Sequence, residues 1–124
     1  MRIVQSTPLV PTGTDGNAAG PVATPSTGAG DVSVIHQRQV PNAVGPHHSH
    51  DREEVLYLLT GAVSIQTGEY RHSLRQGDAA IIPGGVVHRI ETTSDVPAEW
   101  LLVATSGVGF FNTEGTPVTP PWSA

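Results

Sequence analysis

Half of the histidines in this sequence stand in one short segment. The segment PHHSHDREE, residues 46–54, holds three of the six histidines together with three acidic residues. Residues two apart on a β-strand point to the same face, so His48 and His50 share one face and His47 takes the other. If the chain turns after His50 and a new strand starts at Glu54, the side chains of His48, His50 and Glu54 converge on one point.

A fourth candidate ligand follows a turn further along the chain. The segment GDAAIIPGGVVH places His88 just after a Pro-Gly-Gly turn, at the start of another expected strand. Three imidazoles and one carboxylate around one point form a site for one divalent transition metal, and these donors suit Fe, Mn, Ni, Cu, Co or Zn. The set contains no soft ligand, so the residues leave the identity of the metal open.

The other histidines and the neighbouring carboxylate have plainer interpretations. His47 is adjacent to a ligand but on the opposite face, which predicts an exposed side chain or one that packs behind the ligands. Glu53 competes with Glu54 for the carboxylate position, and strand parity favours Glu54. His36 and His72 have no partners at a useful spacing and are interpreted as ordinary surface or core residues.

The elements that must position these residues are short strands. From residue 31 onward, apolar runs such as EVLYLLT, AVSIQTG and AEWLLVATS alternate with the glycine-containing breaks TGA, TGE, QGD and PGG. Such breaks indicate hairpins, and no amphipathic stretch of helical length is present. The sequence therefore predicts an all-β fold, a sandwich or a barrel. The runs EVLYLL and WLLVA are apolar at even and odd positions, which predicts strands covered on both faces.

The length and composition of the chain exclude several classes of protein. The chain has 124 residues, which suits one domain, and its net charge of −5 argues against nucleic acid or an anionic membrane as a partner. It has no lysine and no cysteine, which excludes Schiff-base lysines, thiol nucleophiles, thiolate ligands and disulfides. The initial MRIV is too short for the apolar part of a signal peptide, and no run has the length of a membrane span. The expectation is a cytoplasmic protein.

Both histidine segments resemble the motifs of the cupin superfamily. The resemblance covers residues 31–107 and implies the conserved β-barrel, of jelly-roll type, found in small single-domain cupins. It also implies one divalent metal, with up to two coordination positions left for water or substrate. The motif residues are His48, His50, Glu54 and Gly61 in the first segment, and Gly77, Pro83, Gly85 and His88 in the second; the implied metal ligands are His48, His50, Glu54 and His88.

Two positions depart from the family pattern. Asn42 stands at the opening glycine of the first motif, and asparagine tolerates the left-handed backbone conformation that the turn requires. Thr92 replaces the closing asparagine of the second motif, a position that is not a ligand. Neither change removes a donor from the site.

The chain is divided into an N-terminal arm, residues 1–30, a barrel, residues 31–107, and a C-terminal tail, residues 108–124. The arm is rich in Pro, Gly, Thr, Ser and Ala, which predicts a flexible arm, or an irregular segment packed over the barrel or a partner with a short strand at RIVQ. The tail is expected to pack on the outside of the barrel or on a partner; a lid over the pocket is the alternative. The aromatic residues that would fix it are Phe110, Phe111 and Trp122.

Strand parity and the alignment to the motifs also predict the pocket. Arg38 and Arg89 lie opposite in parity to Gln37 and His88, so no cation is expected inside. A sugar phosphate would require such a cation, whereas an apolar or aromatic molecule with oxygen atoms that reach the metal would not. The predicted lining residues are Ile35, Gln37, Leu56, Leu58, Ile90, Trp100 and Leu102.

These features leave several functions open. One hypothesis is a dioxygenase whose metal chelates the substrate. A second is a redox-neutral, metal-assisted isomerase, lyase or cyclase similar to the polyketide cyclases among the cupins, and a third is a small-molecule binding module without turnover. A homodimer is expected, because an outward apolar band would otherwise face solvent; its residues are Val55, Tyr57, Leu59, Leu101 and Val103.

Overall fold

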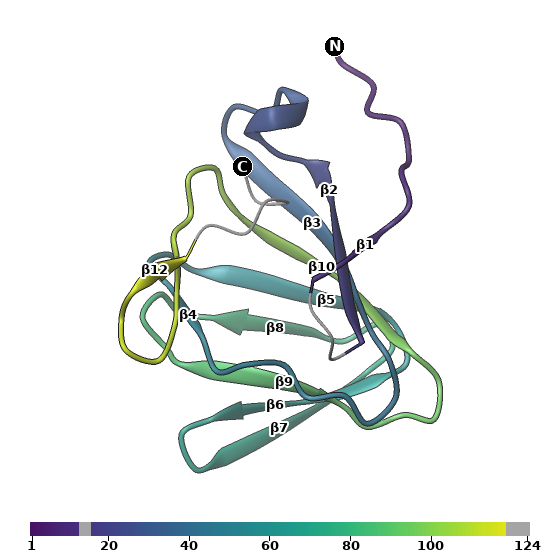
Figure 1. Ribbon diagram of the computed structural model, residues 1–124, viewed down its shortest axis with the longest axis vertical. Helices are drawn as coiled ribbons and strands as arrows, with labels where there is room; N and C mark the ends of the chain where they lie inside the picture. The colour runs from purple at the N-terminus through teal and green to yellow at the C-terminus, as the bar shows by residue number, and fades with distance from the viewer. Residues whose placement is uncertain (13–15, 119–124) are drawn as a thin grey trace.

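Nearly all regular structure in the protein is β-strand, as Figure 1 shows for the computed structural model. The structure describes residues 1–12 and 16–118. No helix in these residues has the length and apolar character needed to cross a membrane. The elements are β1 Val10–Pro11, β2 Asn17–Ala23, the 3-10 turn η1 Pro25–Thr27, β3 Val32–Gln39, β4 Ser49–His50, β5 Glu54–Thr60, β6 Ala62–Thr67, β7 Tyr70–Arg75, β8 Ala79–Ile82, β9 His88–Thr92, β10 Ala98–Thr105, β11 Phe110–Phe111 and β12 Pro117–Val118.

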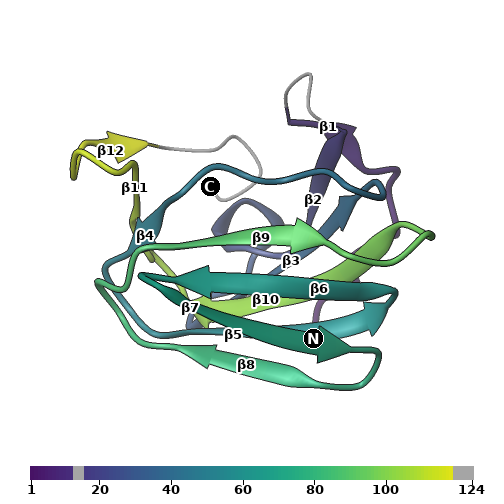
Figure 2. The same ribbon diagram turned by 90° about the horizontal axis from the view of Figure 1, so that it is seen from below.

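These strands form two main sheets and one small sheet. The order is β1-β2-β3-β10-β5-β8 in the first sheet, β7-β6-β9 in the second and β12-β11-β4 in the third. In Figure 1 the β7-β6-β9 sheet lies at the bottom of the molecule, and Figure 2 shows β4, β11 and β12 together at one end of it. The all-β prediction is confirmed, and the arrangement agrees with the barrel that the resemblance implies.

Strand parity is as the sequence predicts. Along β10, Trp100 and Leu102 are buried while Leu101 and Val103 are only partly buried. Along β5, the alternation starts with the buried Glu54. Pairing then aligns the inner faces of the strands: Trp100 lies opposite Gln37 and Leu58, Leu102 opposite Ile35 and Leu56, and Ala104 opposite Glu54.

The N-terminal segment contains a strand where none was predicted. Residues 17–23 form β2, which pairs antiparallel with β3, while the RIVQ residues form no strand. Ala, Gly and Pro have low strand propensity, so the local sequence gives no signal, and pairing with the open edge of β3 decides the outcome. Pro21 stands where the register shifts, a position that tolerates its missing N–H.

Two turns keep the motif strands in place. Asn42 has a φ of 64°, so it takes the left-handed conformation that the sequence predicts for it. Gly61, between β5 and β6, has a φ of 77°, and a Cβ added there would lie 2.9 Å from the Ala98 Cα. Only glycine meets both conditions without strain.

The interior holds two apolar clusters. The larger fills the space between the two main sheets and includes Leu56, Leu58, Ile90 and Trp100. The smaller joins β2, β3, β10 and β11, and its members are Ala19, Ile35, Leu102, Ala104 and Phe110.

Candidate metal centre

The four predicted ligands come together from separate strands at one end of the barrel. His50 ends β4, Glu54 begins β5 and His88 begins β9. His48 is joined to His88 by an isolated antiparallel bridge, with backbone N to O distances of 2.9 Å in both directions. One potential ligand atom from each residue lies within 4.8 Å of the others.

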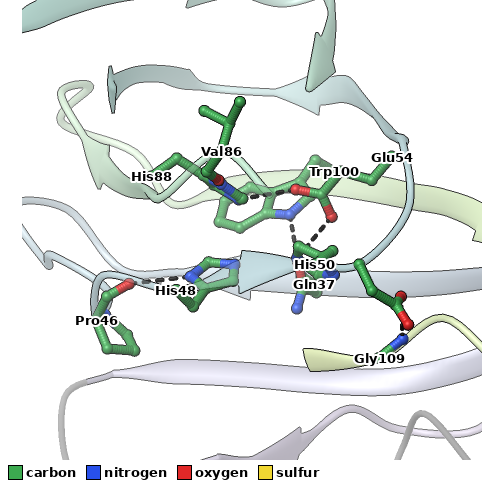
Figure 3. Close-up of polar contacts among 10 residues, drawn as sticks. Gln37, Pro46, His48, His50, Glu54, Val86, His88, Trp100 and Gly109 are labelled. Atoms are coloured by element: carbon green, nitrogen blue, oxygen red, sulfur yellow. Dashed lines mark hydrogen bonds and ion pairs between the residues drawn. The ribbon is translucent and has the colours of Figure 1, made fainter. Parts of the chain in front are cut away.

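The donor atoms converge on the Glu54 carboxylate (Figure 3). The Nε2 atom of His50 lies 2.9 Å from Glu54 Oε2, and that of His88 lies 2.8 Å from Glu54 Oε1. All three side chains are buried, whereas His48 is partly exposed. His50 Nε2, His88 Nε2 and Glu54 Oε2 have no partner with hydrogen-bond geometry. Buried polar atoms without partners are costly, and a metal bound by their lone pairs would satisfy them.

Backbone carbonyls fix two of the imidazoles. His48 Nδ1 lies 3.0 Å from Pro46 O, and His88 Nδ1 lies 2.9 Å from Val86 O. A carbonyl can only accept, so in each ring Nδ1 carries a proton and Nε2 is the atom that faces the centre. This is the arrangement of metal-ligating histidines, which donate the second ring N–H to a carbonyl or carboxylate.

Electrostatics favour an ionised Glu54 carboxylate beside imidazoles that are neutral or carry a proton that a metal can displace. Burial opposes ionisation of Glu54, but its contacts with His50 and His88 outweigh this effect and lower its pKa to about 2. Burial, aided by the neighbouring His88, lowers the pKa of His48 to about 4. Burial also opposes protonation of His88, yet the Glu54 carboxylate raises its pKa. The residues present therefore fit a divalent cation, which would take the place of the His88 proton.

A cavity of about 680 Å³ opens beside the cluster. His48 and Glu54 line it, together with four of the seven residues predicted for the pocket: Gln37, Ile90, Trp100 and Leu102. The other three, Ile35, Leu56 and Leu58, also face inward, but they are packed in the core and are not on the cavity wall. Arg38, expected on the opposite face, is exposed and borders the cavity.

The start of the tail forms β11, which pairs with β4 at the end of the barrel and buries one of its side chains. Phe110 is buried, pairs with His50 across β11 and β4, and places its ring centroid 4.5 Å from that of His50. Gly109 N donates to Asp51 Oδ1 at 2.6 Å, which ties the tail to the loop between two ligands. Phe111 is partly buried, and Trp122 lies outside the described residues.

Sequence reasoning named Phe110 as an anchor of the tail but not as a cavity residue, and it missed β2, whose residues Ala18, Ala19 and Pro21 line the cavity. Their signal is weak, because an aromatic pair among glycines and a run of small residues fit many surface positions equally well.

The remaining histidines and Glu53 lie away from the centre. His47 and Glu53 are exposed, as parity predicts. His36 Nε2 forms a partly exposed ion-pair contact of 2.9 Å with Glu99 Oε1. His72 Nε2 lies 3.1 Å from Thr67 Oγ1 in an exposed hydrogen bond.

Comparison with known proteins identifies relatives. A model of the Cupin domain family matches residues 35–104. Protein SchB of Streptomyces halstedii is 31% identical over 83 residues, which are 63% of this chain and 60% of SchB, so the match spans less than two thirds of that relative. The polyketide cyclase RemF from Streptomyces resistomycificus superposes with a TM-score of 0.72 at 20% identity, covering 98% of this chain and 82% of RemF. An oxalate oxidase has the same TM-score at 20% identity, covering 82% of this chain and 57% of the oxidase. At these identities the structural likeness shows the fold.

Proposed function

This chain belongs to the cupin family, and on that basis we propose that it is a metal-dependent enzyme acting on an apolar, oxygen-bearing small molecule. The proposed reaction is redox-neutral, of the cyclase, isomerase or lyase type, with a polyketide-like substrate. Ring closure of such a substrate joins an enol carbon to a carbonyl carbon of the same molecule, and loss of water then follows in a dehydrating cyclisation.

The observation that carries this proposal is the placement of a polar donor cluster at one end of an apolar cavity. Ile90, Trp100, Leu102 and Phe110 line that cavity, and two of the donors, His48 and Glu54, also lie on its wall. An oxygen atom of a ligand can reach the cluster while its carbon frame packs on the apolar wall. The likeness to RemF, a polyketide cyclase, extends over 98% of this chain, and therefore over the N-terminal strand and the tail as well as the barrel.

The residues of the chain hold and orient the reacting groups. A bound divalent metal supplies Lewis acidity that polarises a carbonyl or enol oxygen. Pro46 O and Val86 O accept from Nδ1 of His48 and His88 and hold both rings with Nε2 facing the cluster. Phe110 packs against His50 and keeps water from that side of the cluster. Among the described lining residues, the titratable side chains are Arg38, His48 and Glu54, so the other lining residues orient the substrate and exchange no proton with it.

A second candidate is a dioxygenase, because three histidines and one glutamate also suit redox-active iron, manganese, nickel or copper. This candidate is supported by the oxalate oxidase, which superposes with the same TM-score as RemF and carries oxidative chemistry on this fold. A binding module without turnover is the third possibility, and it uses the same cavity.

The purified chain is loaded in turn with Zn, Fe(II), Mn(II) and Ni(II). It is then incubated with linear poly-β-ketones that carry an aromatic ring. Product mass is measured by mass spectrometry and oxygen uptake by an electrode. A new product that separates from the substrate by chromatography and has either the same mass or the mass less one water, formed without oxygen uptake, supports the cyclase. Incorporation of oxygen atoms supports the dioxygenase, and binding without conversion under every metal supports the binding module. The metal-free chain is the matched control.

A further inference from the structure

Two glutamines on β3 use their amides differently. Gln39 is buried, its Oε1 accepts from Thr92 Oγ1 at 2.7 Å, and its Nε2 donates to Ile90 O at 3.2 Å. Gln37 lies on the cavity wall, and the bond that the structure gives its amide is from Trp100 Nε1 to Gln37 Oε1, at 2.6 Å (Figure 3). Gln39 is therefore fully engaged within the fold, whereas Gln37 is engaged through its oxygen.

The chemistry of the indole ring decides which way the Gln37 amide faces. The indole Nε1–H is a donor and cannot accept, so the atom that meets it must be the amide oxygen. The NH₂ group then lies on the side away from Trp100. Trp100 is 4% exposed and packed in the core, and it lies directly opposite Gln37 in the β3–β10 pairing. The buried ring therefore holds the amide in one orientation.

The Gln37 NH₂ group is a donor on the cavity wall. Gln37 is partly exposed and lines the same cavity as His48 and Glu54. The wall around it is mixed, with Trp100 and Leu102 apolar and Arg38 and Gln39 polar. A substrate oxygen that accepts from this NH₂ group replaces water there, and a ligand that supplies this oxygen gains over one that leaves the donor unpaired.

We propose that Gln37 is a specificity-determining residue that donates a hydrogen bond to a substrate oxygen distant from the metal, and that Trp100 is its positioning residue. This inference rests on the proposed function, because the metal cluster supplies the other end of the ligand. Along β10, Glu54 pairs with Ala104 and Gln37 with Trp100. Four residues separate these points, roughly 13 Å of strand at a rise of about 3.3 Å per residue. The substrate class is therefore a ketone or phenol of several rings, with a further oxygen beyond the ring that reaches the metal cluster.

Two probes differ in the oxygens that lie beyond the metal-binding catechol. Alizarin is a three-ring catechol whose central ring carries two quinone carbonyls, and its anthracene analogue is the same catechol without them. Titration calorimetry of the zinc-loaded chain gives the affinity for each. We expect the wild-type chain to prefer alizarin, by about tenfold, the effect of one well-placed hydrogen bond.

The decisive variant is Gln37→Glu. It keeps an oxygen for Trp100 Nε1 and replaces the NH₂ donor by a carboxylate oxygen that repels a carbonyl. We expect the affinity for alizarin to fall by about tenfold or more, with that for the analogue unchanged. Gln66→Glu is the matched control, because it makes the same charge change at β6, where Gln66 Oε1 accepts from Arg89 Nε at 3.1 Å outside the cavity. We expect it to bind both probes as the wild type does.

Trp100→Phe tests the positioning role. Phenylalanine keeps an apolar ring in the core and removes the N–H that holds Gln37. We expect the preference for alizarin to fall while the affinity for the analogue is retained, a selectivity change that a loss of packing alone would not produce. Thermal melting checks that the variant folds.

Failure of this inference differs from failure of the proposed function. Equal affinity of the wild-type chain for the two probes, no binding of alizarin, or undiminished alizarin binding by Gln37→Glu would each overturn the role of Gln37, whatever turnover is found. Selective binding of alizarin without conversion of any ketone would retain Gln37 and remove the enzymatic proposal.

Discussion

The two halves of the barrel interior are made from the same strands but differ in chemistry. In β5, Glu54 belongs to the donor cluster, and Leu56 and Leu58 on the same face belong to the core between the sheets. In β9, His88 and Ile90 divide in the same way. One half is dry and closely packed, and the other collects buried polar atoms that lack partners. The difference teaches that the apolar half supplies most of the packing that stabilises the fold, and that the polar half is arranged for binding.

Loss of metal should be the largest effect. In the His48→Ala, His88→Ala double variant, two of four donors are removed, so we expect metal content per chain to fall from about one to near zero. His47→Ala, an exposed neighbour of the cluster, should retain full occupancy. Elemental analysis after dialysis measures both. Full occupancy in the double variant would contradict the ligand assignment.

Truncation in the dry half should destabilise without affecting the metal. Leu58 is fully buried, and Leu58→Ala should lower the free energy of unfolding by about 2–5 kcal/mol because it leaves a cavity in the core. Leu59→Ala, on the outer face of the same strand, should cost less, about 1 kcal/mol. Urea unfolding gives the values, and metal content of folded Leu58→Ala should equal that of the wild type. A smaller loss in the free energy of unfolding at Leu58 than at Leu59 would contradict the assignment of Leu58 to the inner face of β5.

Acidification should weaken the metal-free protein through the donor half. The pKa of His48 is about 4 in the folded protein and 6.5 ordinarily, so the unfolded state takes up this proton first and stability falls as pH drops from 6.5 to 4. The stabilisation from Glu54 is present above its ordinary pKa of 4.5 and is lost as pH falls towards 2. The contribution of His88 has the opposite sign: it is complete below pH 6.5 and is lost as pH rises through its raised pKa.

Thermal melting of the chelator-treated protein across pH measures these changes. His48→Gln should flatten the loss between pH 6.5 and 4, and His88→Gln should reduce the loss on the alkaline side. If His48→Gln loses as much stability between pH 6.5 and 4 as the wild type does, the assignment of that loss to His48 is wrong.

Self-association should be the smallest effect, and it concerns the outer face of β5 and β10. We propose a homodimer that covers the apolar band Val55, Tyr57, Leu59, Leu101 and Val103, in which Tyr57 is 44% exposed. Light scattering at micromolar concentration should give twice the mass of one chain. Tyr57→Ser should raise the dissociation constant about tenfold, as an aromatic contact at an interface would. A monomeric wild-type chain would contradict the proposal.

The sequence predicted the donor half better than its surroundings, and the reason is physical. The spacing of His48, His50 and Glu54 is a local property, since strand parity and one short turn determine which side chains meet. His88 follows a Pro-Gly-Gly turn that begins its strand at a fixed point. The inward faces of β5 and β10 follow from the same alternation, which is why Trp100 and Leu102 lie where they were expected.

The walls of the cavity depend on long-range pairing that local sequence does not specify. β2 consists of small residues with low strand propensity, and only the free edge of β3 gives it its structure. Phe110 is placed by its pairing with His50, far away in the chain. How deep an inward side chain lies in the barrel also depends on the whole fold. Parity alone therefore did not separate the core residues from the cavity residues. The core residues are Ile35, Leu56 and Leu58, and the cavity residues are Gln37 and Ile90.

The two outermost strands of the six-stranded sheet limit how copies of this chain can associate. β1 is two residues long and contains Pro11, which has no N–H to offer along the free edge. At the other edge, β8 spans four residues and is followed by Pro83. Short edges interrupted by proline are poor templates for strand addition. The edges of this sheet are therefore protected against strand addition, which favours contact between chains through its outer face.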